Sequence, residues 1–144
     1  MVLDAESKAA ADTSAGAGAR RGSVLIVDDE AGVRAMLVEL LSGEGFECLQ
    51  ASDGEQALKL LESKTPTLGI LDLALPGMNG AELALRMREK LPDVPLIALS
   101  GQLKMWEPDD LRDLGFERIF AKPMDCDEFL RVCRDSAGLD RPVN

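Results

Sequence analysis

The stretch VLIVDDE, residues 24–30, joins an apolar run to two adjacent carboxylates, Asp28 and Asp29. A short run of aliphatic and β-branched residues is typical of a strand that is buried on both faces. Two carboxylates roughly 4–6 Å apart each disfavour ionisation of the other, and partial burial adds a desolvation cost. The stretch therefore predicts a buried strand that ends where a cation balances the two acidic groups.

The rest of the chain alternates apolar runs with segments of helical periodicity. Five runs are predicted to be strands: 24–28, 46–51, 67–73, 95–100 and 117–121. Three intervening helices are expected to begin at capping pairs: Ser52 with Glu55, Asn79 with Glu82, and Asp125 with Glu128. Strands that alternate with helices form a parallel sheet with helices on both faces. The predicted fold is an α/β domain with an open, doubly wound, five-stranded parallel sheet.

The length and composition predict one globular domain. Residues 1–22 are rich in Ala, Gly and Ser, which predicts a flexible leader before a domain at 23–138 and a short tail at 139–144. The net charge of −10 argues against direct binding of nucleic acid, and no apolar run approaches the roughly 20 residues of a membrane span. Three scattered cysteines fit reduced thiols in the cytoplasm better than a disulfide framework.

Polar side chains follow the predicted strands at their carboxyl ends, where open α/β sheets bind ligands. These residues are Asp28, Asp29, Asp72, Ser100 and Lys122. The chain has no histidine, so oxygen ligands are the expected metal chemistry, and they suit Mg²⁺ or Mn²⁺. A lysine and a hydroxyl beside the carboxylates are donors that a phosphoryl group needs.

Four segments resemble the receiver domain of two-component response regulators. They are VDDE at 27–30, LDLALPGMNG at 71–80, ALSG at 98–101 and AKP at 121–123. The resemblance covers about residues 23–138 and implies a flavodoxin-like sheet with strand order 2-1-3-4-5. It also implies a phosphorylation-dependent switch of a two-component system or phosphorelay, here as a stand-alone receiver that signals by protein–protein contact.

The resemblance implies a role for each matching residue. Asp72 would accept the phosphoryl group, and Ser100 and Lys122 would contact its oxygens. The Lys122–Pro123 peptide would be cis. Asp28 would act on the metal largely through a bound water. The implied ligands of Mg²⁺ or Mn²⁺ are the carboxylates of Asp28, Asp29 and Asp72 and the backbone carbonyl of Ala74.

The resemblance also implies partners. A histidine kinase or a phosphotransfer protein would donate the phosphoryl group, and an unidentified downstream protein would read the switch. The chain would catalyse only its own phosphorylation and dephosphorylation, with Gln102 tuning the lifetime of the acyl phosphate. We expect a cytoplasmic monomer or weak dimer that binds neither nucleic acid nor membrane.

The output face departs from the family pattern. Ile119 stands where receivers usually carry Tyr or Phe, and Phe120 cannot replace it because adjacent strand residues face opposite sides. Pro108 falls where the family's helix would be mid-course, which predicts a short helix from about Pro108 to Leu114. The loop at 101–107 would carry Trp106 and receive the signal from Ser100.

Other functions predict other residues. A phosphohydrolase of the haloacid-dehalogenase kind would carry a second Asp two residues after its nucleophile, where this chain has Ala74. A flavodoxin would need a Ser/Thr-rich phosphate loop after the first strand, where this chain is acidic. A phosphorylation-independent scaffold or adaptor, and a receiver fragment of a longer regulator, stay open as alternatives.

Overall fold

The structure is a computed structural model that describes residues 22–101, 106–122 and 124–137. Strands and helices alternate throughout this part of the chain. The strands are β2 (Ser23–Val27), β3 (Glu47–Ala51), β4 (Leu68–Asp72), β5 (Leu96–Ser100) and β6 (Phe116–Ala121). The helices are α1 (Ala31–Gly43), α2 (Gly54–Leu60), α3 (Gly80–Lys90), α4 (Pro108–Asp113) and α5 (Cys126–Ser136). None of these helices is long and apolar enough to cross a membrane.

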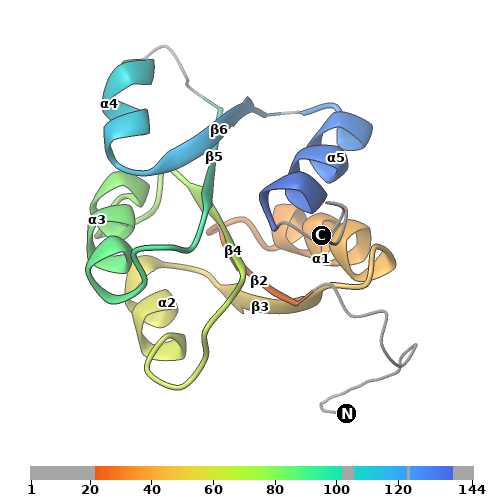
Figure 1. The fold of residues 1–144 in the computed structure, drawn as a ribbon, viewed down its shortest axis with the longest axis horizontal. Coiled ribbons are helices and arrows are strands. Elements are labelled where there is room, and N and C mark those ends of the chain that lie inside the picture. The colour runs from red at the N-terminus through yellow and green to blue at the C-terminus, as the bar shows by residue number, and fades with distance from the viewer. Residues whose placement is uncertain (1–21, 102–105, 123, 138–144) are drawn as a thin grey trace, which may run out of the picture.

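The five strands form one parallel sheet in the order β3-β2-β4-β5-β6. Counted from the amino terminus this order is 2-1-3-4-5, as expected from the resemblance. Helices α2, α3 and α4 cover one face of the sheet, and α1 and α5 cover the other (Figure 1). The direction of winding changes at β2, so the carboxyl ends of β2 and β4 flank the switch point where such sheets bind ligands.

Successive residues of β2 belong to two separate layers of the core. Leu25 and Val27 pack with buried residues of α2, α3 and α4, whereas Val24 and Ile26 pack with buried residues of α1 and α5. All four side chains are almost completely buried. The strand is apolar without interruption because both of its faces lie inside the protein.

Each predicted strand differs from the observed one by one residue, at one end in three strands and at both ends in 24–28 and 67–73. Two of the predicted helix caps are confirmed, since the side chains of Asn79 and Asp125 accept from the expected backbone N–H groups at 2.9 and 3.0 Å. The prediction for α2 was wrong: Asp53 is the cap and accepts from the Gln56 N–H at 2.8 Å. Ser52 lies one residue too early, and its own N–H donates to the Gln56 side chain at 2.9 Å.

Gly80 allows α3 to begin directly against the end of β4. A Cβ at this position would collide with the Asp72 carbonyl oxygen and would lie 2.8 Å from the Leu73 Cα. The Gly80 N–H donates to the Leu73 carbonyl at 3.1 Å. The missing side chain thus sets the distance between α3 and the acidic end of the strand.

Replacing Gly80 with Ala is expected to lower the free energy of unfolding by about 2–3 kcal/mol, because rigid backbone atoms must move to admit the new methyl group. Gly43→Ala is the matched control. A Cβ at Gly43 would meet nothing within 4 Å, so that variant should be neutral or slightly more stable. Urea unfolding of the two variants checks the difference, and equal stability would contradict the close packing at Gly80.

Candidate functional site

Three carboxylates meet at the carboxyl edge of the sheet. Asp28 and Asp29 follow β2, and Asp72 is the last residue of β4. One carboxylate oxygen of each residue lies within 4.8 Å of the other two. Asp28 and Asp72 are buried, whereas Asp29 is exposed. Two of the charged groups are therefore withdrawn from water, and the third remains in contact with it.

Lys122 supplies a cation to this cluster. Its Nζ donates to Asp28 Oδ2 at 2.7 Å, to Asp72 Oδ2 at 3.1 Å and to Glu30 Oε1 at 3.3 Å. The backbone N–H of Lys122 also donates to the Ser100 carbonyl at 2.9 Å, which holds the residue beside the end of β5. One positive charge beside the acidic cluster is thus part of the chain itself, and it contacts Asp28, Asp72 and Glu30. The divalent cation that the acidic pair predicts stays a prediction.

Burial and hydrogen bonds shift the pKa values of Asp72 and Lys122. Burial raises the pKa of Asp72, although the Ala74 N–H, at 3.0 Å from Asp72 Oδ1, and Lys122 both favour the charged form. Burial alone would lower the pKa of Lys122, but the hydrogen bonds to Asp28 and Asp72 outweigh it and raise the pKa above its usual value. Lys122 is therefore charged at neutral pH. Its partner Asp72 is a carboxylate that has lost much of its contact with water on folding.

Backbone contacts fix the position of Asp28. The Glu30 N–H donates to Asp28 Oδ1 at 2.9 Å, and the Asp28 N–H donates to the Ala51 carbonyl at 3.2 Å. Arg34 Nη1 donates to the Asp28 carbonyl at 2.6 Å. No role for Glu30 or Arg34 was predicted from the sequence. Their spacing of four residues at the start of α1 was the available signal, because it places both on the side of the helix nearest Asp28.

Ser100 lies at the same edge as the carboxylates. It is the buried last residue of β5, and the strand register pairs it with Ala121, next to Lys122. The register of β4 and β5 pairs Asp72 with Leu99. The two strand ends that carry Asp72 and Ser100 are therefore neighbours, as the sequence predicted.

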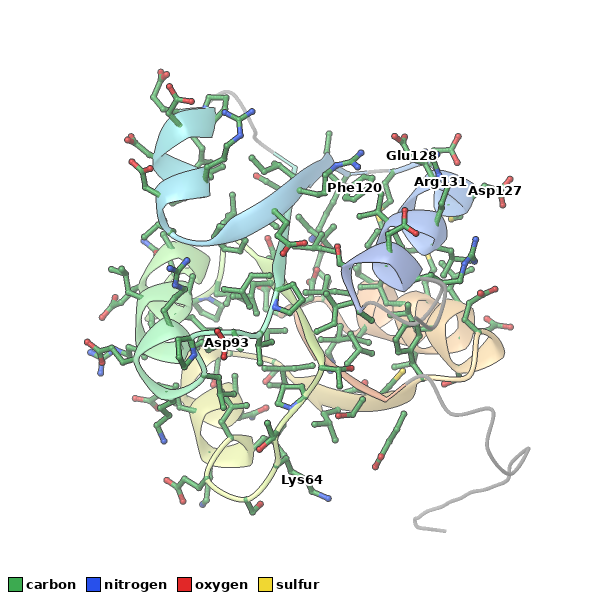
Figure 2. All side chains as sticks on the ribbon, viewed as in Figure 1. Lys64, Asp93, Phe120, Asp127, Glu128 and Arg131 are labelled. Carbon is green, nitrogen blue, oxygen red and sulfur yellow. The ribbon has the colours of Figure 1, made fainter. Side chains whose placement is uncertain are left out.

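The residues of the predicted output face divide between the two core layers. Ile119 and Trp106 are partly buried and pack against the layer formed with α2, α3 and α4. Phe120 faces the other layer, on the side of β6 toward α5 (Figure 2). Its ring meets Phe129 of α5 edge to face, with 5.4 Å between ring centroids. The opposite orientation of Ile119 and Phe120 is thus confirmed.

Helix α4 begins at Pro108, as predicted, and ends at Asp113, one residue before the expected end. Proline is tolerated there because the first turn of a helix does not use its backbone N–H. Three further predictions fall on residues outside the described ones: most of the loop at 101–107, the side chain of Gln102, and the cis peptide before Pro123.

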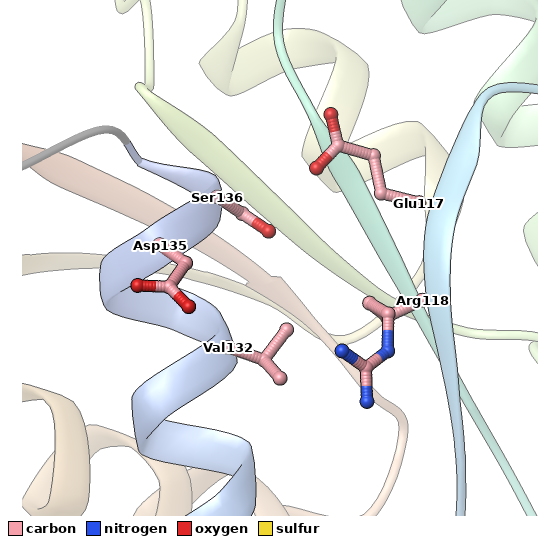
Figure 3. Close-up of a pocket in the computed structure, with 5 residues that line it drawn as sticks. All are labelled: Glu117, Arg118, Val132, Asp135 and Ser136. Carbon is pink, nitrogen blue, oxygen red and sulfur yellow. The ribbon is translucent and has the colours of Figure 1, made fainter. Parts of the chain in front are cut away.

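A pocket of about 190 Å³ lies between β6 and α5 (Figure 3). Glu117 and Arg118, near the beginning of β6, form one wall, whereas Lys122 follows the other end of this strand. The remaining lining residues belong to α5: Val132, Asp135 and Ser136. The chemistry of the charged groups, and not the presence of this pocket, identifies the candidate site.

The sequence profile of the response regulator receiver domain matches residues 24–134. The chain belongs to this family. Sporulation initiation phosphotransferase F of Bacillus subtilis is 38% identical over 107 residues, which cover 73% of this chain and 85% of that protein. The DNA-binding transcriptional regulator NtrC of Escherichia coli K12 is 31% identical over 109 residues, which cover 76% of this chain and 23% of that protein.

Solved structures of receiver domains have the same fold. The signal receiver domain of an HD domain-containing protein from Pseudomonas fluorescens Pf-5 superposes with a TM-score of 0.74 at 30% sequence identity. The match covers 83% of this chain and 96% of that one. The receiver fold and the assignment to two-component signalling are therefore confirmed.

In metal-free buffer, Asp72→Asn is expected to raise the free energy of unfolding at neutral pH. Burial raises the pKa of Asp72, so folding disfavours the charged carboxylate, and the amide avoids that penalty. The gain should be absent below the unfolded pKa of about 4, where the carboxyl group is protonated in both states. It should grow as the pH rises from there to the folded pKa and level off above it. Urea unfolding with a chelator across this range measures it; a variant less stable than wild type at neutral pH would refute the argument.

Proposed function

We propose that Asp72 is the phosphoacceptor of this receiver domain, with a histidine kinase or a phosphotransfer protein as the phosphodonor. The observation that carries the proposal is the position of the Asp72 carboxylate. It lies at the end of a central strand, within 4.8 Å of two other carboxylates and 3.1 Å from Lys122 Nζ. A nucleophilic carboxylate next to a fixed cation is suited to the transfer of a charged phosphoryl group.

The proposed transfer forms one bond and breaks another. A carboxylate oxygen of Asp72 bonds to phosphorus while the bond from phosphorus to the donor's histidine nitrogen breaks. The nitrogen keeps the electron pair and then takes up a proton. Lys122 is already within hydrogen-bond distance of Asp72, so it is placed to donate to the phosphoryl oxygens, with the Ser100 hydroxyl as the second proposed donor.

We further propose that the acidic cluster holds Mg²⁺ or Mn²⁺. The proposed ligands are Asp28, Asp29, Asp72 and the backbone carbonyl of Ala74. Carboxylate and carbonyl oxygens are the donors these ions prefer, and exposed Asp29 fits an ion that keeps several of its waters. When bound, the ion would offset negative charge on the carboxylates and the phosphoryl oxygens. Lys122, Glu30 and Arg34 would still position Asp28 as described.

The proposed output is contact with a downstream protein through the segment that follows β5. Ser100, at the end of β5, is the proposed link between the phosphoryl group and Trp106. Ile119 offers no aromatic ring for a switch, and Phe120 is engaged with Phe129 in the other core layer. Both observations support a signal that passes through the segment carrying Trp106 rather than through an aromatic side chain of β6.

We propose that the receiver domain comprises residues 23–138, which the family match at 24–134 supports. Most of the leader at 1–22 and the tail at 139–144 lie outside the described residues. Cys48, Cys126 and Cys133 are free thiols, which fits the proposed location in the cytoplasm. The chemistry of the domain is proposed to be confined to its own phosphorylation and dephosphorylation.

Phosphoramidate with Mg²⁺ is expected to label the wild-type chain with a phosphate that hydroxylamine removes, because an acyl phosphate is sensitive to this nucleophile. Asp72→Asn should abolish the label. Asp93→Asn, which alters an exposed residue just before β5, at the opposite edge of the sheet from the cluster, should retain it. A label that persists in Asp72→Asn would refute the assignment, and a wild-type chain that is never labelled would favour the adaptor function.

Beryllofluoride, a mimic of the phosphoryl group, is expected to change the fluorescence of Trp106, the single tryptophan of the chain. The change should require Mg²⁺ and should be absent in Asp72→Asn. Amide exchange across 106–113 should change with it. If this segment stays unchanged while Ile119 and its neighbours respond, the proposed route of the signal is wrong.

A further inference from the structure

Glu30 is the outermost carboxylate in contact with Lys122. Its Oε1 lies 3.3 Å from Lys122 Nζ, and its side chain is 63% exposed. The other two carboxylates that accept from the same ammonium group, Asp28 and Asp72, are 0% and 4% exposed. A ligand that approaches Lys122 from solvent therefore meets the charge of Glu30 before it reaches Asp72.

The contact with Lys122 is separate from the structural role of the Glu30 backbone. Glu30 directly precedes α1, but its side chain caps no backbone N–H of the helix. Its own N–H donates to Asp28 Oδ1 at 2.9 Å, and its carbonyl accepts from the Arg34 N–H at 3.1 Å. Because the backbone makes both of these bonds, a change of the Glu30 side chain leaves them in place.

We propose that Glu30 is a specificity-determining residue that disfavours small, strongly anionic phosphodonors, such as free acyl phosphates, in the reaction at Asp72. The inference rests on the proposed function of Asp72. An incoming phosphoryl group must approach Lys122 beside the negative charge of Glu30. It must also replace Glu30 as an acceptor of one of the three N–H groups of Lys122.

The charge of the donor decides the size of this effect. Repulsion between Glu30 and a donor is proportional to the donor's charge, so a dianion is disfavoured more than a monoanion. A phosphohistidine on a protein arrives with a surface around it, and contacts elsewhere on that surface can offset the repulsion. A free acyl phosphate has no such contacts. Glu30 thus favours delivery by a protein over delivery by a small metabolite.

Glu30→Gln tests the proposal because it removes the charge while it keeps the side-chain length and an acceptor oxygen for Lys122. The rate of Asp72 phosphorylation is measured with acetyl phosphate, a dianion, and with phosphoramidate, a monoanion. In the first reaction the bond from phosphorus to the acetate oxygen breaks, and acetate leaves with the electron pair. In the second the bond to nitrogen breaks, and ammonia leaves after taking up a proton. In both, an Asp72 oxygen bonds to phosphorus.

We expect Glu30→Gln to accelerate the reaction with acetyl phosphate by about fivefold and the reaction with phosphoramidate by about twofold, because the repulsion acts on an exposed and partly screened charge. Both gains should shrink as salt is added. Glu39→Gln is the matched control: it removes the same charge from an exposed position of α1, outside the cluster. This control should react at the wild-type rate with both donors.

Equal acceleration with the two donors, or acceleration no greater than that of Glu39→Gln, would overturn the role of Glu30 and leave Asp72 as the acceptor. The proposal also fails if Glu30→Gln, like the wild type, reacts with phosphoramidate but not with acetyl phosphate, because the carboxylate is then not the barrier. Labelling that survives Asp72→Asn in either background would overturn both proposals. The two failures are therefore distinguishable.

Discussion

The contact of Lys122 with Asp28 and Asp72 joins the ends of three strands through one ammonium group. These acceptors lie 94 and 50 residues away from the lysine in the chain. Carboxylates buried at a sheet edge lose solvation, and a nearby positive charge offsets part of that loss. The same ammonium group therefore stabilises the two buried carboxylates in the unphosphorylated protein. It also lies where the proposed phosphoryl group would bring negative charge, so one position serves both folding and the proposed reaction.

The two faces of the sheet pack against two separate core layers, so a movement at the carboxyl edge can affect one layer without the other. Neighbouring residues near the end of β6 belong to different core layers: Ile119 packs against the layer with α4, and Phe120 packs in the layer with α5. The edge-to-face contact of Phe120 with Phe129 anchors α5, whereas α4 is short and begins with Pro108. The proposed route from Ser100 to Trp106 therefore does not require α5 to repack.

Sequence patterns predicted the strands and the residues at their ends because burial on both faces leaves an uninterrupted apolar run, and parallel topology then brings the strand ends together. Contacts that depend on fine position escaped prediction. Ser and Asp are both common at helix N-caps, and the backbone conformation decides that Asp53, and not Ser52, occupies the cap position of α2. Arg34 binds a backbone carbonyl, and Glu30 meets Lys122 across 92 residues, so the spacing of Glu30 and Arg34 did not by itself identify their partners.

The position of Lys122 after the last strand also has a consequence for synthesis. Chains emerge from the ribosome amino terminus first, so β2, β3 and β4 are made long before β6. Until Lys122 appears, a nascent sheet that buries Asp28 beside Asp72 has two carboxylates without their ammonium partner. Burying Asp28 beside Asp72 before Lys122 has been synthesised would therefore add little stability to the nascent sheet. Lys122 is translated only after the five strands of the described sheet, and it makes this edge favourable to form, which couples folding of the acidic edge to synthesis of the whole sheet.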